Sequence, residues 1–153
     1  DLAAQWRGME KDGQWRFTPP THVVAALDQA LGEHAAEGGV AGRHARYAKN
    51  CRVLVEGMRA LGFRPLLGDN VQAPIIVTFH MPTHPNWSFA RFYDALKEDG
   101  FVIYPGKLAA AESFRIGCIG DLDERDMRAA LAAVGRALAT MGVRLEHIAD
   151  VNR

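Results

Sequence analysis

Two stretches in the first half of the chain carry apolar residues at helical spacing. From Thr21, which we expect to be an N-cap after two prolines, apolar residues fall on one face as far as Glu37–Gly39. A second run extends from Tyr47 to Leu61 with spacings of alternately four and three, and Gly62 is its natural C′ residue. The pattern predicts either one long broken helix or a pair of helices, after about twenty residues that show no clear period.

Beyond Gly62 the period changes to that of strands separated by turns. The four predicted strands cover residues 63–67, 74–80, 101–104 and 113–119. A helix capped by Ser88 and ending at Gly100 separates the second strand from the third. A last helix starts at Asp121 or Asp123, and its inner face consists of Met127, Leu131, Val134, Leu138 and Met141. This order predicts an α/β (α+β) fold in which helices cover one face of a small, mainly antiparallel sheet.

Composition narrows the classes of partner. The 153 residues are 48% hydrophobic, enough for one core, and 18 basic residues balance 18 acidic ones. Nucleic acids and membrane surfaces attract a basic excess, so we expect neither as a partner. No apolar run approaches the roughly 20 residues of a membrane span. The first residues have neither a signal-peptide layout nor an initiator methionine, which predicts a chain that continues from something longer.

Arg115 is the one strong oddity, because it lies inside the short apolar run "SFRIGCIG". A guanidinium keeps its proton in a protein, so a half-buried arginine must bind an anion or several carbonyls. The pattern alone leaves two interpretations open. In the first, Arg115 pairs with a nearby Asp or Glu or caps a helix C-terminus. In the second, it is a bidentate clamp for a carboxylate or a phosphonate.

The other reactive side chains give little indication of a catalytic or binding site. The histidines, including His80 and His84 around a proline loop, lack zinc-ligand spacing, so we predict no metal site. Cys51 and Cys118 form no disulfide framework, which favours a reducing cytoplasm, and Cys118 is predicted to be a core thiol. Lys107 lies in "YPGK", which is not a phosphate loop; it is either a solvated turn residue or an aid to an anion near Arg115.

Several segments resemble a known family. They are "QWRFTPPTH" at 14–22, "EGGVAGRHARYAKN" at 37–50, "GMRALGF" at 57–63, "LKEDGFVIYPGK" at 96–107 and "FRIGCIGD" at 114–121. Together they resemble the 2-aminoethylphosphonate–pyruvate aminotransferases, which are class V members of the fold-type I pyridoxal-phosphate enzymes. The likeness extends from Gln5 to about Met141. "GFVIYPGK" followed by "FRIG" is the most specific part, whereas "RIG" alone indicates only the wider aminotransferase group.

The resemblance implies a domain organisation and a function. Residues 1–20 would continue from a missing large domain, and residues 21–153 would be the C-terminal small domain with its leading helices. The parent would be a cytoplasmic homodimer that uses pyridoxal 5'-phosphate. It would move the amino group of 2-aminoethylphosphonate to pyruvate, which gives phosphonoacetaldehyde and L-alanine.

The resemblance also implies roles for single residues. Arg115 in "FRIG" matches the family arginine that receives the acidic end of the substrate. Thr18 matches the threonine that reaches the cofactor phosphate of the neighbouring subunit; without the resemblance, it is an ordinary residue ahead of two prolines. Trp15 stands where relatives in the wider class can carry a phosphate-contacting tyrosine, and an indole offers no hydroxyl for that contact.

The family's Schiff-base lysine has no match in this chain. Its four lysines, Lys11, Lys49, Lys97 and Lys107, all lack the surroundings of that residue. We therefore predict no catalytic residue here and an inactive isolated chain. The alternative function is a free-standing small-anion-binding or dimerisation module without catalysis, and the predicted fold does not separate the two.

Overall fold

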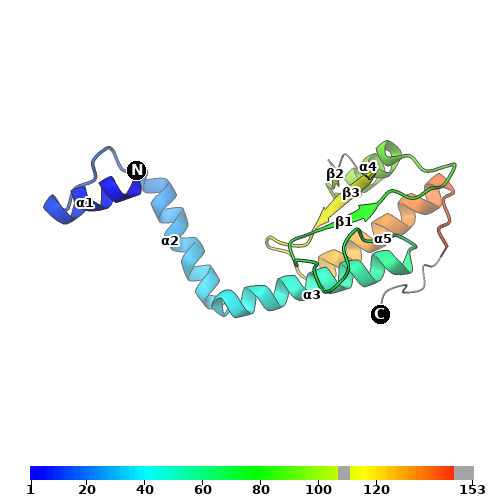
Figure 1. Cartoon of the computed structure of the whole chain (residues 1–153), viewed down its shortest axis with the longest axis horizontal. Helices are drawn as coiled ribbons and strands as arrows, with labels where there is room; N and C mark the ends of the chain where they lie inside the picture. The colour runs from blue at the N-terminus through cyan, green and yellow to red at the C-terminus, as the bar shows by residue number, and fades with distance from the viewer. Residues whose placement is uncertain (107–110, 147–153) are drawn as a thin grey trace. The chain divides into compact units, whose positions relative to one another are not determined.

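The computed structural model describes residues 1–106 and 111–146, so Lys107 lies outside the described residues. Within that part of the chain there are five helices and one three-stranded sheet (Figure 1). The chain divides into two compact units, Asp1–Ala41 and Gly42–Arg153.

Helix α1, Leu2–Asp12, lies where the sequence shows no clear period. Local contacts hold its two ends. The Asp1 carboxylate accepts hydrogen bonds from two amides of the first turn, and Gly13, at φ 72°, donates its amide hydrogen to the Met9 carbonyl. None of the eleven helical residues, all of them described, is buried. Because α1 buries no apolar stripe, its sequence carries no period to predict it from.

Helix α2, Thr21–Ala36, begins where expected, but the predicted N-cap is wrong. Thr21 is the first helical residue, and Pro20 precedes it without a side-chain capping bond. The φ of Pro20 is fixed by its ring at a value that suits a helix start, and its carbonyl accepts hydrogen bonds from two amides of the first turn. The chain then passes through Gly38 and Gly39, whose φ angles are 97° and 65°. These two glycines make a pair of helices rather than one.

Helix α3, Gly39–Ala60, ends at the predicted glycine. Gly62 has a φ of 88° and donates its amide hydrogen to the Arg59 carbonyl, and Phe63 donates to the Met58 carbonyl. This pair of bonds satisfies two carbonyls of the last turn and turns the chain away from the helix axis. The prediction of Gly62 as C′ residue is confirmed.

The sheet consists of β1, Ile76–His80, β2, Tyr104–Pro105, and β3, Ser113–Gly117. Its order is β1-β3-β2, and both pairings are antiparallel. β3 is therefore the central strand, with a neighbour on each side. This arrangement confirms the predicted small antiparallel sheet.

Two of the predicted strands are wrong in extent. Residues 63–67 lie beside β1 through a single bridge between Pro65 and Phe79, with the Leu66 amide donating to Thr78 and the His80 amide donating to Arg64. The Phe63 amide donates to the Met58 carbonyl at the end of α3, so the pairing extends no further in that direction. Residues 101–104 contribute only their last residue to β2. The Phe101 amide is used at the end of the preceding helix, where it donates to the Leu96 carbonyl, so it is lost to the sheet.

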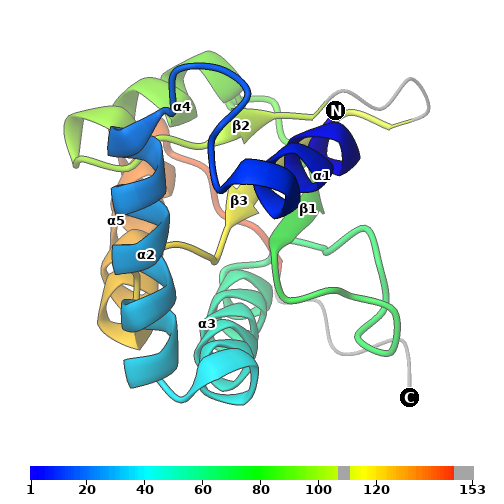
Figure 2. The same ribbon diagram turned by 90° about the vertical axis from the view of Figure 1, so that its left-hand side faces the viewer.

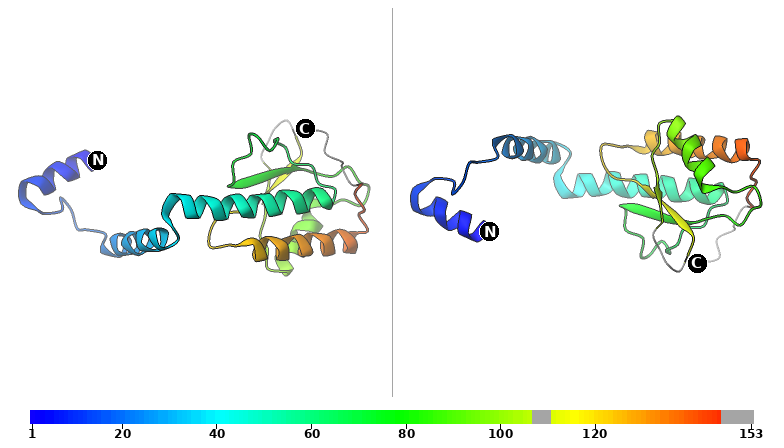
Figure 3. Two further views of the ribbon diagram at one scale, coloured as in Figure 1. Left: turned by 90° about the horizontal axis from the view of Figure 1, so that it is seen from below. Right: turned by 90° about the horizontal axis from the view of Figure 1, so that it is seen from above.

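Helices cover one face of the sheet, as predicted. Helix α4, Phe89–Glu98, is capped by Ser88, and helix α5, Glu124–Met141, starts at Asp123 with a capping box. Figure 2 and the left view of Figure 3 show α3, α4 and α5 on the same side of the strands. The inner face of α5 is confirmed, with four of its five predicted residues buried and Leu131 packed at the edge.

The core between sheet and helices is aromatic. Phe114 on β3 is fully buried and contacts five other rings. These rings belong to Phe63, Phe79, Trp87, Phe89 and Phe92. The fold therefore places one face of the central strand in a packed interior and leaves its opposite face for other contacts.

Candidate functional site

Arg115 lies on the face of the sheet opposite the core. On β3, Phe114 and Ile116 are buried against the helices, and Arg115 between them points the other way. Its cross-strand partners in the register are Thr78 of β1 and Tyr104 of β2. The central strand thus presents a guanidinium between two hydroxyl-bearing neighbours.

Arg115 has few contacts of its own. Its Nη2 donates a hydrogen bond of 3.3 Å to the carbonyl of Pro105, which is long for such a bond. Its Nε–H is shielded from solvent and has no acceptor among the described residues. In residues 1–106 and 111–146, no carboxylate forms an ion pair with it.

These contacts bear on the two interpretations of Arg115. An internal ion pair is not observed in the described part of the chain, and Pro105 belongs to a strand rather than to a helix C-terminus. A guanidinium with one long bond to a neutral carbonyl retains most of its capacity to bind an anion. The geometry therefore favours an external anion on the open face.

A close approach of two strands shapes one edge of this face. The Gly106 amide donates to the Ser113 carbonyl at 2.7 Å, and a Cβ at Gly106 would collide with Ser113. A glycine is therefore required directly after β2. The Ser113 hydroxyl is buried and lacks a partner among the described residues.

His80 lies two residues beyond Thr78 on β1 and pairs with Ser113 in the register. Burial, and then the charge of Arg64, lower the pKa of His80. His84 instead accepts a hydrogen bond from the Asn86 amide in the following loop. The described residues contain no group of three or more potential metal ligands.

Thr18 lies in the exposed loop between α1 and α2, in the unit Asp1–Ala41. Trp15 and Phe17 in the same loop are 41% and 75% exposed. Arg115 belongs to the other unit, so the structure describes the two predicted site residues separately. Both occupy surfaces from which a group outside their own unit can be contacted.

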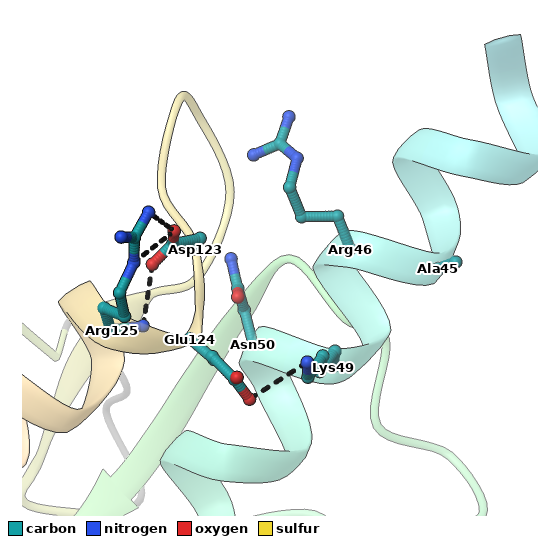
Figure 4. Close-up of a pocket in the computed structure, with 7 residues that line it drawn as sticks. All are labelled: Ala45, Arg46, Lys49, Asn50, Asp123, Glu124 and Arg125. Atoms are coloured by element: carbon teal, nitrogen blue, oxygen red, sulfur yellow. Dashed lines mark hydrogen bonds and ion pairs between the residues drawn. The ribbon is translucent and has the colours of Figure 1, made fainter. Parts of the chain in front are cut away.

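A hollow of about 410 Å³ lies between α3 and the start of α5. Figure 4 shows its lining, in which Lys49 pairs with Glu124 at 3.1 Å and Arg125 pairs with the helix cap Asp123. Arg46 donates to two carbonyls of the loop that follows β3, at 2.6 and 2.8 Å. The charged side chains of this hollow therefore have partners within the protein. The two hydrogen bonds of Arg46 hold α3 against the loop that follows β3.

Cys51 and Cys118 are in contact within the core. Cys118 is fully buried, which confirms the prediction of a core thiol, and Cys51 is 7% exposed. A hydrogen bond with the Cys118 thiol, which also donates to the Ile75 carbonyl at 3.4 Å, lowers the pKa of Cys51 to about 7. The contact with Cys51, together with burial, raises the pKa of Cys118. Because the two residues are far apart along the chain, their contact could not be predicted from the sequence.

Within the described residues, no helix is both long enough and apolar enough to cross a membrane. No protein-family model matches the chain.

Curated relatives are nevertheless close in sequence. The chain is 57% identical over 148 residues to 2-aminoethylphosphonate–pyruvate transaminase of Burkholderia ambifaria, which covers 97% of this chain and 40% of the relative. It is 60% identical over 143 residues to the transaminase of the same name from Rhizobium meliloti, which covers 94% of this chain and 37% of the relative. Over nearly its whole length, then, the chain matches these transaminases, and it spans about 40% of their length.

Solved structures of aminotransferases share the fold. Pyridoxamine–pyruvate aminotransferase from Mesorhizobium loti has a TM-score of 0.76 at 26% identity, over 89% of this chain and 35% of its own. Aspartate aminotransferase of subgroup IV from Thermus thermophilus has a TM-score of 0.75 at 22% identity, over 92% and 39%. These neighbours confirm the predicted fold class for this chain.

Proposed function

We propose that this chain supplies the small domain of a pyridoxal-phosphate-dependent transaminase. The enzyme would transfer the amino group of 2-aminoethylphosphonate to pyruvate and give phosphonoacetaldehyde and L-alanine, in the cytoplasm and as a homodimer. The sequence match to transaminases of that name, over 97% of the chain, is the observation that carries the proposal. The shared fold with other aminotransferases supports it at the level of architecture.

Arg115 would receive the acidic end of each substrate. Both amino-group donor and acceptor carry an anion, which is a phosphonate in one and a carboxylate in the other. The guanidinium lies on the open face of the sheet without a carboxylate partner in the described residues. Its planar fork would bind two oxygens and fix the orientation of the substrate, which a single point charge does not do. Orientation of the reacting group is worth several orders of magnitude in rate.

The lysines of the described chain do not fit the covalent attachment of the cofactor. Lys11 and Lys97 are exposed on helices, and Lys49 is paired with Glu124 on the surface. Pyridoxal phosphate, when bound, supplies the carbonyl group and the electron sink of the reaction. The attachment lysine would therefore come from a part of the enzyme other than these residues.

Thr18 fits a contact to the cofactor phosphate from outside its own unit. Its loop is exposed, so its hydroxyl and the neighbouring amides are accessible to a phosphate group. In the proposed homodimer this loop would reach the cofactor of the neighbouring subunit. The chain alone would then have one phosphate contact and no covalent attachment, and it would be inactive.

The test is Arg115→Lys in a protein that carries this chain at the length of its relatives. The substitution keeps the charge and removes the fork. We expect kcat/KM to fall about tenfold to a hundredfold for both 2-aminoethylphosphonate and pyruvate. Cofactor absorbance should be unchanged, because Arg115 would not hold the cofactor.

Arg91→Lys on the exposed side of α4 is the matched control and should change neither substrate. Unaltered kinetics in Arg115→Lys would remove Arg115 from the site. They would favour the alternative function, a module that binds anions or dimerises without catalysis.

A further inference from the structure

The neighbours of Arg115 on the open face offer further donors. Thr78 and Tyr104 pair with Arg115 in the two registers, so their side chains project from the same face of the sheet. Directly opposite residues of antiparallel strands have Cβ atoms about 4.5–5.5 Å apart. Thr78 and Tyr104 therefore flank Arg115 on the open face.

The guanidinium is turned toward β2. Its Nη2 donates to the carbonyl of Pro105, the residue after Tyr104, and no bond joins it to β1 among the described residues. Because Nε is shielded from solvent, the Nη groups are the donors that remain for a ligand. The bond to Pro105 places Nη2 beside β2, the strand that carries Tyr104.

Tyr104 has a hydroxyl to offer. Its side chain is 54% exposed, and its hydroxyl makes no hydrogen bond within the part of the chain that is described. A phenol hydroxyl can donate a hydrogen bond to a charged oxygen. Thr78, in contrast, is partly buried and has a short side chain.

We propose that Tyr104 is a specificity residue that distinguishes a phosphonate from a carboxylate at this site. A carboxylate presents two oxygens in one plane, and the two Nη groups satisfy both. A phosphonate presents three oxygens on a tetrahedral phosphorus, so one oxygen is left outside the plane of the guanidinium. The Tyr104 hydroxyl donates to that third oxygen. This inference rests on the proposed function and adds to it the residue that selects the amino-group donor.

The experiment uses Tyr104→Phe in the protein of full length, since this change removes the hydroxyl and keeps the ring. We expect kcat/KM for 2-aminoethylphosphonate to fall about tenfold to a hundredfold, the effect of one hydrogen bond to a charged group. The value for L-alanine in the reverse half-reaction should stay the same. Calorimetric titration with methylphosphonate and with acetate should show the same contrast in Kd without any chemistry.

Two variants serve as controls. Tyr93→Phe makes the same chemical change on α4, and Thr78→Val removes the hydroxyl on the other side of Arg115. Neither should alter the ratio of the two affinities.

The outcomes separate the inference from the proposed function. Equal losses for both anions in Tyr104→Phe, no loss for either, or a selective loss in Thr78→Val would overturn the role of Tyr104. Arg115→Lys with unchanged affinity for both anions would instead overturn the proposed site as a whole.

Discussion

The two units of the chain treat their apolar side chains in opposite ways. In Asp1–Ala41 no residue is buried, all of these residues being described, and Leu27 and Leu31 of α2 are 59% and 57% exposed. From Gly42 on, more than twenty apolar side chains form one closed core between three helices and a sheet. Burial of apolar surface is the dominant favourable term in folding. Only the second unit therefore buries enough apolar surface to account for its own stability.

The helices of the first unit are held by local contacts at their ends and not by buried apolar side chains. Helix α1 depends on the Asp1 cap and on Gly13, and α2 starts at Pro20 without a side-chain cap. Caps contribute about 1 kcal/mol each, and isolated helices of fewer than about 15 residues are marginal in water. We therefore expect the helices of this unit to depend on contacts that the rest of the molecule or another chain provides.

The strongest test of the comparison is to separate the units. A peptide of residues 1–41 at low concentration should lose most of its helical circular dichroism, because nothing in it is buried. A protein of residues 42–153 should keep a cooperative urea transition, because its core is complete. A cooperative transition in the short peptide would show that the first unit is independently stable.

Truncation of one apolar side chain should lower the free energy of unfolding far more in the second unit than in the first. Phe114→Ala removes a fully buried ring with five aromatic contacts, and we expect it to lower the free energy of unfolding by about 3–5 kcal/mol. Leu27→Ala on α2 should change it by less than about 0.5 kcal/mol, since that side chain is exposed. Urea denaturation of both variants measures the contrast. Similar losses would mean that α2 is packed as tightly as β3.

Glycine-to-alanine changes in α3 and α2 should also have opposite effects in the two units. A Cβ at Gly57 of α3 would collide with the side chain of Leu131 on α5, and crowding of this kind costs about 1–3 kcal/mol. A Cβ at Gly32 of α2 would meet nothing within 4 Å, so Gly32→Ala should add up to about 1 kcal/mol of helix propensity. Gly57→Ala should lower the midpoint temperature of thermal unfolding, whereas Gly32→Ala should raise the helical content measured by circular dichroism. A stabilised Gly57→Ala would mean that Leu131 moves aside without loss.

The smallest expected effect concerns pH and lies within the core. Because Cys51 has a folded pKa of about 7, below its ordinary value, its ionisation stabilises the fold above the unfolded pKa, and this contribution is lost as pH falls toward 7. The raised pKa of Cys118 acts in the opposite sense above pH 9, where the unfolded thiol ionises and the folded one does not. Stability from this pair should therefore rise from pH 7 to about pH 9 and then fall.

Cys118→Ala removes the donor and should return the pKa of Cys51 toward its ordinary value. Thiolate ultraviolet absorbance as a function of pH measures the change, with Cys51→Ala as the control that lacks the low-pH titration. At pH 7 the effect on stability should be below about 1 kcal/mol, because Cys51 is only half ionised there. A wild-type protein without thiolate titration below pH 9 would contradict the contact.

The sequence predicted those features that depend on neighbouring residues. The helix α5, with a start at Asp121 or Asp123 and an inner face of regular period, needs only local information, as does the Gly62 stop of α3, and the structure places the cap at Asp123. The sequence also singled out Arg115 as a half-buried arginine in an apolar strand, whereas the face of the sheet on which it lies comes from the structure. Helix α1 was missed because its stability is not marked by an apolar stripe.

What remained beyond prediction depends on contacts between distant segments. The pairing of Arg115 with Thr78 and Tyr104 is set by a register that the sequence does not display. The same holds for the contact between Cys51 and Cys118. Residues 63–67 were predicted as a strand from their composition, whereas the structure shows one bridge at Pro65, because the Phe63 amide is used at the end of α3.

The position of Arg115 in the middle of the central strand also protects the sheet against mispairing. A shift of β3 by one residue against its neighbours would exchange the two faces, so that Arg115 would enter the aromatic interior and Phe114 would face solvent. A charged guanidinium without a partner in such an interior is very costly. Any alternative pairing of β3 that is out of step by one is thereby excluded during folding. The residue proposed to receive the substrate thus also disfavours any alignment of the strands that is shifted by one residue.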